Sequence, residues 1–271
     1  DHIQIYYGSY GTWNSSSGAG FQFYADGNWQ DMSFPGSPWQ LLALEFDHDG
    51  SGYSYAQNYS SGTGDMTLTY EADLSDSSTI SALHEFDGGP LEITKVESWD
   101  VDSTVVRVTI YLSNTTSSDV ENLRLVHAVD PDHDYNSYGT TNTVNDVRDV
   151  DGDGVADFVE AVGPSSGWTI AYGLCDPTTE EVGLTAWDTD VDATLDDQDG
   201  DTRDDTIHWR HTEERVSAGD SLELTFLVIY GSDSSAAEDL YLDSYSTYCV
   251  ADADGDGYGA SQDCDDTDAT I

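Results

Sequence analysis

The sequence predicts an all-β protein: a large antiparallel β-sandwich with long Asp/Gly-rich calcium-binding loops and one short helix near the C-terminus. Three observations predict this fold class. Apolar and polar residues alternate with period two along much of the chain, helical periodicity is almost absent, and turns rich in Gly, Ser, Asn and Asp separate the alternating stretches. A hydrophobic content of 37%, with 7 Trp, 17 Tyr and 7 Phe, is enough for a core.

The alternation marks out the candidate strands, each bounded by turn residues. In chain order they are His2–Tyr7, Gly20–Tyr24, Trp39–Phe46, Met66–Ala72, Thr79–Phe86, Leu91–Trp99, Thr104–Ser113, Asn122–Ala128, Trp168–Gly173, Glu181–Trp187, Thr206–Thr212 and Ser221–Tyr230. The clearest are the stretches from Val105 to Leu112 and from Leu222 to Tyr230, where apolar residues recur at every second position.

The one convincing helix runs from Ser235 to about Tyr245, with Leu240 and Leu242 as its apolar contacts. No linker divides the strands, so residues 1–247 are predicted to form a single sandwich domain with inserted calcium loops. Residues 248–271 form a distinct Asp/Gly-rich tail, predicted to bind metal.

The charge of the chain excludes several partners. Its 271 residues carry 54 acidic and 7 basic side chains, a formal net charge of −47. We therefore expect no binding to nucleic acid or anionic membrane surfaces, and no apolar run approaches the ~18 residues of a membrane span. Asp outnumbers Glu about threefold, and Asp clustered with Gly is typical of loops that bind Ca²⁺ through several oxygens. The expected cofactor is Ca²⁺, several ions per chain, in salt-rich or divalent-rich surroundings.

The strongest motif lies at residues 149–160. Acidic residues stand at loop positions 1, 3, 5, 9 and 12, Gly at position 6 and a backbone carbonyl at position 7. The predicted ligands are Asp149, Asp151, Asp153, Val155 (carbonyl), Asp157 and Glu160. The flanking residues are poor helix formers, so the segment resembles the isolated calcium loops of dockerin and thrombospondin type 3 repeats, which implies a loop that stabilises a fold. The alternative is an acidic surface turn.

The tail carries a second motif. Its predicted metal ligands are Asp252, Asp254, Asp256, Tyr258 (carbonyl), Asp263, Asp265 and Asp266. The stretch resembles the DxDGDGxG…DCDD metal-binding segment of MopE-type bacterial surface proteins. Cys249 and Cys264 bracket it, and a disulfide closing this loop of ~15 residues would stabilise it by ~3 kcal/mol and imply an oxidising, extracytoplasmic setting. Cys175 is left over and is predicted to be a small buried hydrophobe.

Three weaker loops have similar spacing and are candidate calcium sites, with solvated turns as the alternative. Their predicted ligands are Asp197, Asp199, Asp201 and Asp205 in the first loop, Asp47, Asp49, Ser51 and Tyr53 in the second, and Asp130, Asp132 and Asp134 in the third. Each loop follows a candidate strand, so its oxygens could also combine with distant acids such as Asp188, Asp190 and Asp192.

No catalytic motif is convincing, and the chain is predicted not to be an enzyme. The G-x-S-x-G pattern at 163–167 contains Pro164 and lacks a strand–turn–helix context. His208 and His211 are three apart, which on a strand points them to opposite faces. Among 54 acids a glycosidase carboxylate pair cannot be singled out, so that chemistry stays open.

These features predict an extracellular or cell-surface calcium-binding structural protein that self-associates into a filament or a surface lattice. The segment 1–8 is a candidate donor strand for a neighbouring subunit, although an ordinary edge strand of its own sheet is an equal alternative. The alternative function is a secreted, calcium-dependent domain that binds or acts on carbohydrate. A third possibility is a halophilic protein whose acids only hold water and salt.

Overall fold

The computed structural model confirms the all-β sandwich. It describes residues 2–8, 11–13, 20–25, 27–33, 40–58, 66–186, 190–197 and 199–249. The tail ligands predicted between Asp252 and Asp266, and Cys264, lie outside the described residues.

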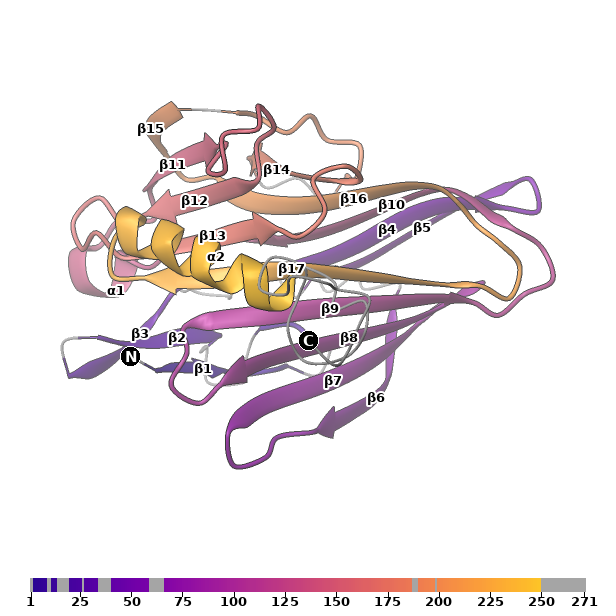
Figure 1. The fold of residues 1–271 in the computed structure, drawn as a ribbon, viewed down its shortest axis with the longest axis horizontal. Helices are drawn as coiled ribbons and strands as arrows, with labels where there is room; N and C mark the ends of the chain where they lie inside the picture. The colour runs from indigo at the N-terminus through magenta and orange to yellow at the C-terminus, as the bar shows by residue number, and fades with distance from the viewer. Residues whose placement is uncertain are drawn as a thin grey trace, which may run out of the picture.

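The strands form three sheets in which hydrogen-bonded neighbours are antiparallel (Figure 1). The three-stranded sheet has the order β1 (Ile3–Ile5), β2 (Phe21–Ala25), β3 (Asn28–Asp31). The five-stranded sheet has the order β14 (Glu180–Thr185), β16 (Thr206–Val216), β10 (Val120–Val129), β4 (Gln40–His48), β5 (Ser51–Asn58). The nine-stranded sheet has the order β15 (Asp199–Arg203), β11 (Thr143–Arg148), β12 (Phe158–Val162), β13 (Thr169–Leu174), β17 (Ser221–Gly231), β9 (Val105–Asn114), β8 (Leu91–Asp100), β7 (Thr79–Gly88), β6 (Thr67–Asp73).

The core lies between the two large sheets, because alternate side chains of their strands point inward. Trp209 of β16 stacks on Phe226 of β17 with ring centroids 4.3 Å apart, which joins the five-stranded sheet to the nine-stranded one. The three-stranded sheet covers one end of this core: Phe23 of β2 packs on Tyr230 of β17 at 3.8 Å. β1 pairs with β2 of the same chain, with Ile3 opposite Phe23, which is the edge-strand arrangement. Self-association stays a prediction.

The C-terminal helix is confirmed and is slightly longer than predicted: α2 spans Ser234–Tyr248. Asp233 caps it by accepting a hydrogen bond from the backbone N–H of Ala236 at 2.9 Å. The helix packs on the outer face of the nine-stranded sheet through Ala237 and Tyr241 (Figure 1). Leu242, an expected apolar contact, is 45% exposed instead, because the helical period places residues 237 and 241 toward the sheet. The other described helix, α1 (Tyr135–Tyr138), is a single turn after β10.

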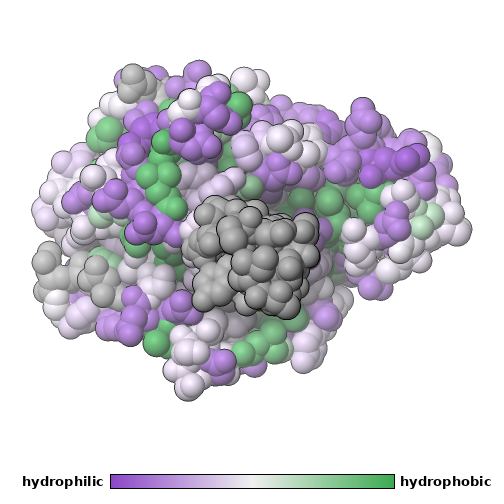
Figure 2. Space-filling view, in the orientation of Figure 1, coloured by the Kyte–Doolittle hydropathy of each residue, from purple (hydrophilic) through white to green (hydrophobic). Residues whose placement is uncertain are grey.

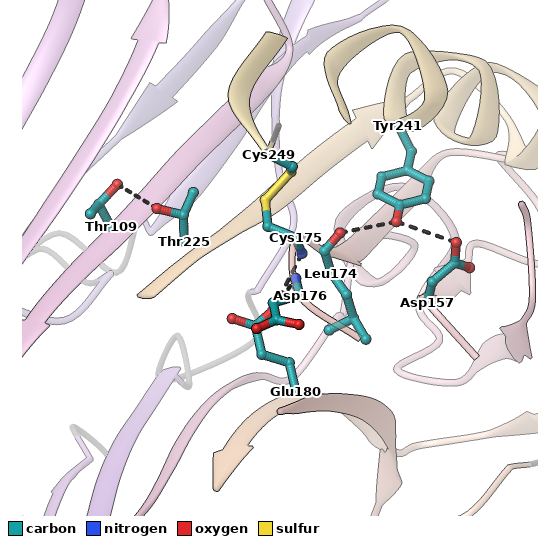
Figure 3. Close-up of a disulfide and its surroundings, with 9 residues drawn as sticks. All are labelled: Thr109, Asp157, Leu174, Cys175, Asp176, Glu180, Thr225, Tyr241 and Cys249. Atoms are coloured by element: carbon teal, nitrogen blue, oxygen red, sulfur yellow. Dashed lines mark hydrogen bonds between the residues drawn. A yellow bond between two sulfur atoms is a disulfide. The ribbon is translucent and has the colours of Figure 1, made fainter. Parts of the chain in front are cut away.

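Two glycines let α2 approach the sheet closely. A Cβ atom on Gly173 of β13 would lie 2.3 Å from the ring of Tyr241, and one on Gly231 would lie 2.6 Å from the backbone nitrogen of Ala237. The hydroxyl of Tyr241 lies 3.0 Å from the carbonyl of Leu174 and 3.3 Å from Asp157 (Figure 3). The helix is thereby held against the ends of β12 and β13.

A disulfide joins Cys175 to Cys249, across 74 residues of sequence (Figure 3). The predicted pairing of Cys249 with Cys264 is therefore wrong, and so is the prediction that Cys175 is a free thiol. The physical reason is the return path of α2: the helix ends where β13 ends, so Cys249 meets a residue that is remote in sequence. Spacing within the tail does not report this contact.

Polar residues dominate the face that carries α2, and hydrophobic side chains appear there in separate patches (Figure 2). Within the described part of the chain, no helix is long and apolar enough to cross a membrane.

Because the disulfide closes a 74-residue separation, Cys175→Ser should lower the free energy of unfolding by about 4 kcal/mol in the chain-entropy model. Urea unfolding measures this change, and Cys264→Ser is the matched control that should leave stability and the disulfide intact. A peptide map of the non-reduced protein that links Cys249 to Cys264 would contradict the assignment.

Candidate functional site

The loop at 149–157 connects β11 to β12, so strands flank it, as the poor helix propensity of its neighbours suggested. Asp149 accepts hydrogen bonds from the backbone N–H groups of Gly152 (2.7 Å) and Gly154 (2.8 Å). Both glycines adopt left-handed backbone angles, with φ of +82° and +97°. One carboxylate oxygen from each of Asp149, Asp151 and Asp153 lies within 4.8 Å of the others, so three of the predicted ligands converge on the surface.

The two remaining acids of this motif point elsewhere. Glu160 is buried in β12, where it accepts a hydrogen bond from the Ser234 hydroxyl (2.8 Å) and pairs with Arg148 (3.2 Å). Asp157 accepts a hydrogen bond from the backbone N–H of Val150 at 2.8 Å and contacts Tyr241. Burial raises the pKa of both carboxyl groups. The expected bidentate Glu160 ligand is thus engaged by an arginine instead.

The predicted loop at Asp47–Tyr53 is a tight hairpin. β4 continues through Asp47 to His48 and β5 begins at Ser51, which leaves only Asp49 and Gly50 in the turn. Both turn residues have positive φ, +50° and +75°, as two-residue hairpins require. Asp47, Ser51 and Tyr53 lie on the paired strands and Asp49 lies in the turn, so the hairpin does not form the predicted ligand loop.

The predicted loop at 197–205 is partly a strand. β15 begins at Asp199 and pairs with β11, and Asp201 forms an ion pair with Arg203 at 3.0 Å. Asp197 is exposed before the strand, and Asp205 is buried in the turn that follows it. Strand pairing spreads these acids along an edge.

The structure instead joins two of the predicted loops. Oxygens of Asp130 and Asp132, which follow β10, lie within 4.8 Å of one another and of Asp204 in the β15–β16 turn. We call these three residues the aspartate triad. Asp130 and Asp132 are 3% and 5% exposed, and burial, together with the neighbouring carboxylates, raises their pKa values well above the ordinary range. Sequence spacing named Asp130 and Asp132, but the partner loop comes from about 70 residues away, beyond what spacing can report.

Asp134, the third predicted ligand of that loop, is not part of the triad. It accepts hydrogen bonds from the backbone N–H groups of Ser165 (2.7 Å) and Ser166 (3.3 Å). It therefore holds the turn after β12, which contains the G-x-S-x-G pattern at 163–167.

A cleft of about 530 Å³ opens between the N-terminal segment and strands β6, β7 and β8. Its walls include Ile3 and Tyr7 from the N-terminal segment, His84 of β7 and Trp99 of β8, and the acids Glu71 and Asp73 stand in exposed positions on β6. The rings of Tyr7 and His84 are 4.4 Å apart. The sequence did not predict any of these residues as part of a binding site, although Ile3 and Tyr7 belong to the candidate donor strand 1–8.

A buried ion pair lies next to the cleft. Lys95 and Glu97 occupy inward-facing positions of β8 and are 1% and 0% exposed. The ammonium of Lys95 lies 3.2 Å from Glu97 and 3.3 Å from the carbonyl of Gly11, and the Trp13 indole N–H donates to Glu97 at 2.7 Å. A buried ion pair costs desolvation energy that apolar residues would not. The sequence signal for this buried pair was the single lysine of the chain, which stands in a strand of alternating apolar and polar residues.

Further polar groups continue from this pair across the core. The backbone N–H of Trp13 donates to the side-chain oxygen Oε1 of Gln40 (2.9 Å), and the side-chain nitrogen of Gln40 lies 2.6 Å from His127 Nε2. An amide nitrogen can only donate, so Nε2 of neutral His127 accepts, and its Nδ1–H donates to the Tyr172 hydroxyl at 2.8 Å. We call the set Lys95, Glu97, Trp13, Gln40, His127 and Tyr172 the polar network.

Burial shifts the titration of the groups around the cleft. Burial, and then the charge of Lys95, lowers the pKa of His84 to about 4. Burial lowers the pKa of Lys95 despite the opposing effect of Glu97, and burial with the Glu97 charge raises that of Tyr7. Near neutral pH, His84 and Tyr7 are therefore neutral groups. The Nδ1 atom of His84 and the indole N–H of Trp99 have no hydrogen-bond partner among the described residues.

No family model and no curated protein matches the sequence. Among solved structures, a polysaccharide lyase is similar with a TM-score of 0.52 and 11% identity, over 89% of this chain and 34% of the lyase. This chain therefore spans about a third of that enzyme. Heparan sulfate lyase HepC from Pedobacter heparinus matches 78% of the chain, and α-galactosidase AgaB from Geobacillus stearothermophilus matches 87%. The matches cover 34% and 35% of those enzymes, at 11% and 10% identity. Both TM-scores are 0.41, which is too low to establish a shared fold.

The prediction that the chain is not an enzyme is contradicted by this comparison, because a protein with this fold, at a TM-score of 0.52, is a polysaccharide lyase. At 11% identity the likeness shows the fold alone.

Lys95→Met should destabilise the protein by about 3–5 kcal/mol, because it leaves the Glu97 carboxylate buried without its cation. The double variant Lys95→Met/Glu97→Gln should recover most of this loss in urea unfolding. Arg215→Met, which removes an exposed pair with Asp119, is the control and should cost no more than about 1 kcal/mol. A similar small cost for Lys95→Met would contradict the buried pair.

The depressed pKa of His84 predicts acid sensitivity. The unfolded chain takes up a proton near pH 6.5 and the folded protein only near pH 4, so stability should fall as pH drops through this window. The loss should reach about 3 kcal/mol, and below pH 4 it should grow no further. Comparing the pH dependence of unfolding for the wild type and for His84→Gln isolates this contribution from other histidines; parallel curves would contradict it.

Proposed function

We propose that this chain is a β-sandwich domain of an extracellular, carbohydrate-active enzyme and that it takes a neutral sugar in the cleft beside Tyr7, His84 and Trp99. The observation that carries the proposal is the cleft itself, which combines aromatic side chains with neutral polar groups that have no hydrogen-bond partner in the described part of the chain. Sugars bind through both kinds of group, since their C–H faces stack on aromatic rings and their hydroxyls exchange hydrogen bonds.

The charge of the site favours a neutral substrate. The net charge of −47 repels uronate and sulfate groups before they arrive, and Glu71 and Asp73 stand at the rim. Hydrogen bonds from Ser75 lower the pKa of Asp73, so this carboxylate remains charged in use. A carboxylate is a strong acceptor for sugar hydroxyls but repels an anionic sugar.

The fold supports the proposal at a general level, since the polysaccharide lyase with this fold is a carbohydrate-active enzyme. The disulfide supports an oxidising, extracellular location. Calcium binding at the 149–153 loop and assembly into filaments remain predictions from the sequence.

A glycan array, followed by titration of the best neutral ligand, tests the proposal. Trp99→Phe and His84→Gln should each weaken binding by up to about tenfold, the value of one hydrogen bond. Trp29→Phe is the matched control, because Trp29 is 42% exposed on β3 and does not line the cleft. The wild type should also release reducing ends from the glycan that it binds. The rate of this release should be lower in the two cleft variants. Retention of anionic glycans alone, or of none, would reject the neutral-sugar site.

A further inference from the structure

We propose that the aspartate triad, Asp130, Asp132 and Asp204, is a binding site for one Ca²⁺ ion that ties the loop after β10 to the β15–β16 turn. The proposal shares no residue with the cleft and does not rest on the proposed function.

The geometry suits a single ion. The three carboxylate oxygens lie within 4.8 Å of one another, so one ion placed among them would lie about 2.8 Å or less from each, close to the 2.3–2.6 Å typical of Ca²⁺. Local contacts fix the carboxylates from both sides: the Thr141 hydroxyl donates to Asp204 at 3.1 Å, and the backbone N–H of Asp132 donates to the Met32 carbonyl at 2.7 Å.

A second observation shows that the site is incomplete without a ligand. Asp130 and Asp132 are both more than nine-tenths buried. Their Oδ1 atoms nevertheless have no hydrogen-bond partner among the described residues. Two carboxylates in this position repel each other and also lose their hydration. Native structures rarely leave such oxygens unsatisfied, which points to a ligand beyond the described residues.

The chain supplies no positive charge for this purpose. Among the described residues, every ion pair of the lysine and the arginines involves another acid, and Arg107 lies over the Tyr248 ring. His133 is adjacent in sequence, but it is fully buried and forms no ion pair with the triad among the described residues. The nearby acids Asp31 and Asp205 add negative charge, and Arg203, which acts on Asp205, forms its ion pair with Asp201. The proposal therefore assigns the counter-charge of the triad to a cation from solution.

The donor set selects the class of cation. Carboxylate oxygens are the only protein ligands in the triad, and neither histidine nor cysteine belongs to it, which favours a hard cation over zinc or copper. Three ligands from two separate loops form an irregular, open shell that water can complete. This arrangement fits Ca²⁺, whose coordination is flexible, better than Mg²⁺, which demands a near-ideal octahedron.

Asp132→Asn tests the site, because a metal site and a metal-free acid pair predict opposite changes in melting temperature when Ca²⁺ is present. In EDTA the amide removes repulsion between buried carboxylates, so the melting temperature of the variant should equal or exceed that of the wild type. In excess CaCl₂ the variant should melt below the wild type, because it lacks a ligand and binds this ion more than about tenfold more weakly. A variant that is more stable than the wild type in both solutions would overturn the site.

Equilibrium dialysis with ⁴⁵Ca²⁺ counts the ions and separates this site from the others. Asp132→Asn and Asp151→Asn should each lower the number of bound ions by one, and the double variant by two. Asp239→Asn, an exposed acid on α2, is the matched control and should lower it by none. Asp204→Asn, which keeps the buried pair intact, decides the question if Asp132→Asn does not fold. An unchanged ion count in Asp204→Asn and Asp132→Asn would also overturn the proposal.

Discussion

Scarcity of positive charge constrains the entire structure. Seven basic side chains face 54 carboxylates, and the single lysine is buried with Glu97. Most carboxylates must therefore take their hydrogen bonds from backbone N–H groups, hydroxyls or solvent. Asp76 illustrates this: it accepts hydrogen bonds from the backbone N–H groups of Ser78 (2.7 Å) and Thr79 (2.9 Å), which lower its pKa. Aspartate in this protein is first of all a turn residue.

That use of aspartate limits how well calcium loops can be predicted from spacing. A turn and a metal loop place Asp and Gly at the same intervals, since both need a short carboxylate beside a tightly curved backbone. At Asp47–Tyr53 the Asp49-Gly50 pair forms a hairpin turn, and the other acid, Asp47, lies on β4. At Asp149–Asp153 the same chemistry brings three carboxylates together. Only the three-dimensional path of the chain distinguishes a hairpin turn from a cluster of carboxylates.

The fold was more predictable than the sites, for a reason visible in individual strands. β8, β9 and β17 bury one face between the sheets, so period-two alternation reported them. β12 is buried on both sides, because α2 covers its outer face, and its sequence shows no alternation to detect. β15 is a polar strand at the sheet edge, where no buried face imposes a pattern.

The cleft and the polar network could not be predicted because their parts come from distant segments. The alternation of β8 places Lys95 and Glu97 on the inner face, but only the folded chain shows that Gly11 and Trp13 meet them there. Trp13 is fully buried, so the N-terminal region completes the core of its own chain. Tyr7 from that same region forms a wall of the cleft, with its ring 6.0 Å from the Lys95 ammonium. The cleft and the buried ion pair therefore share one segment of the chain, and a ligand bound in the proposed site against Tyr7 would also stabilise the contacts that keep Lys95 and Glu97 out of water.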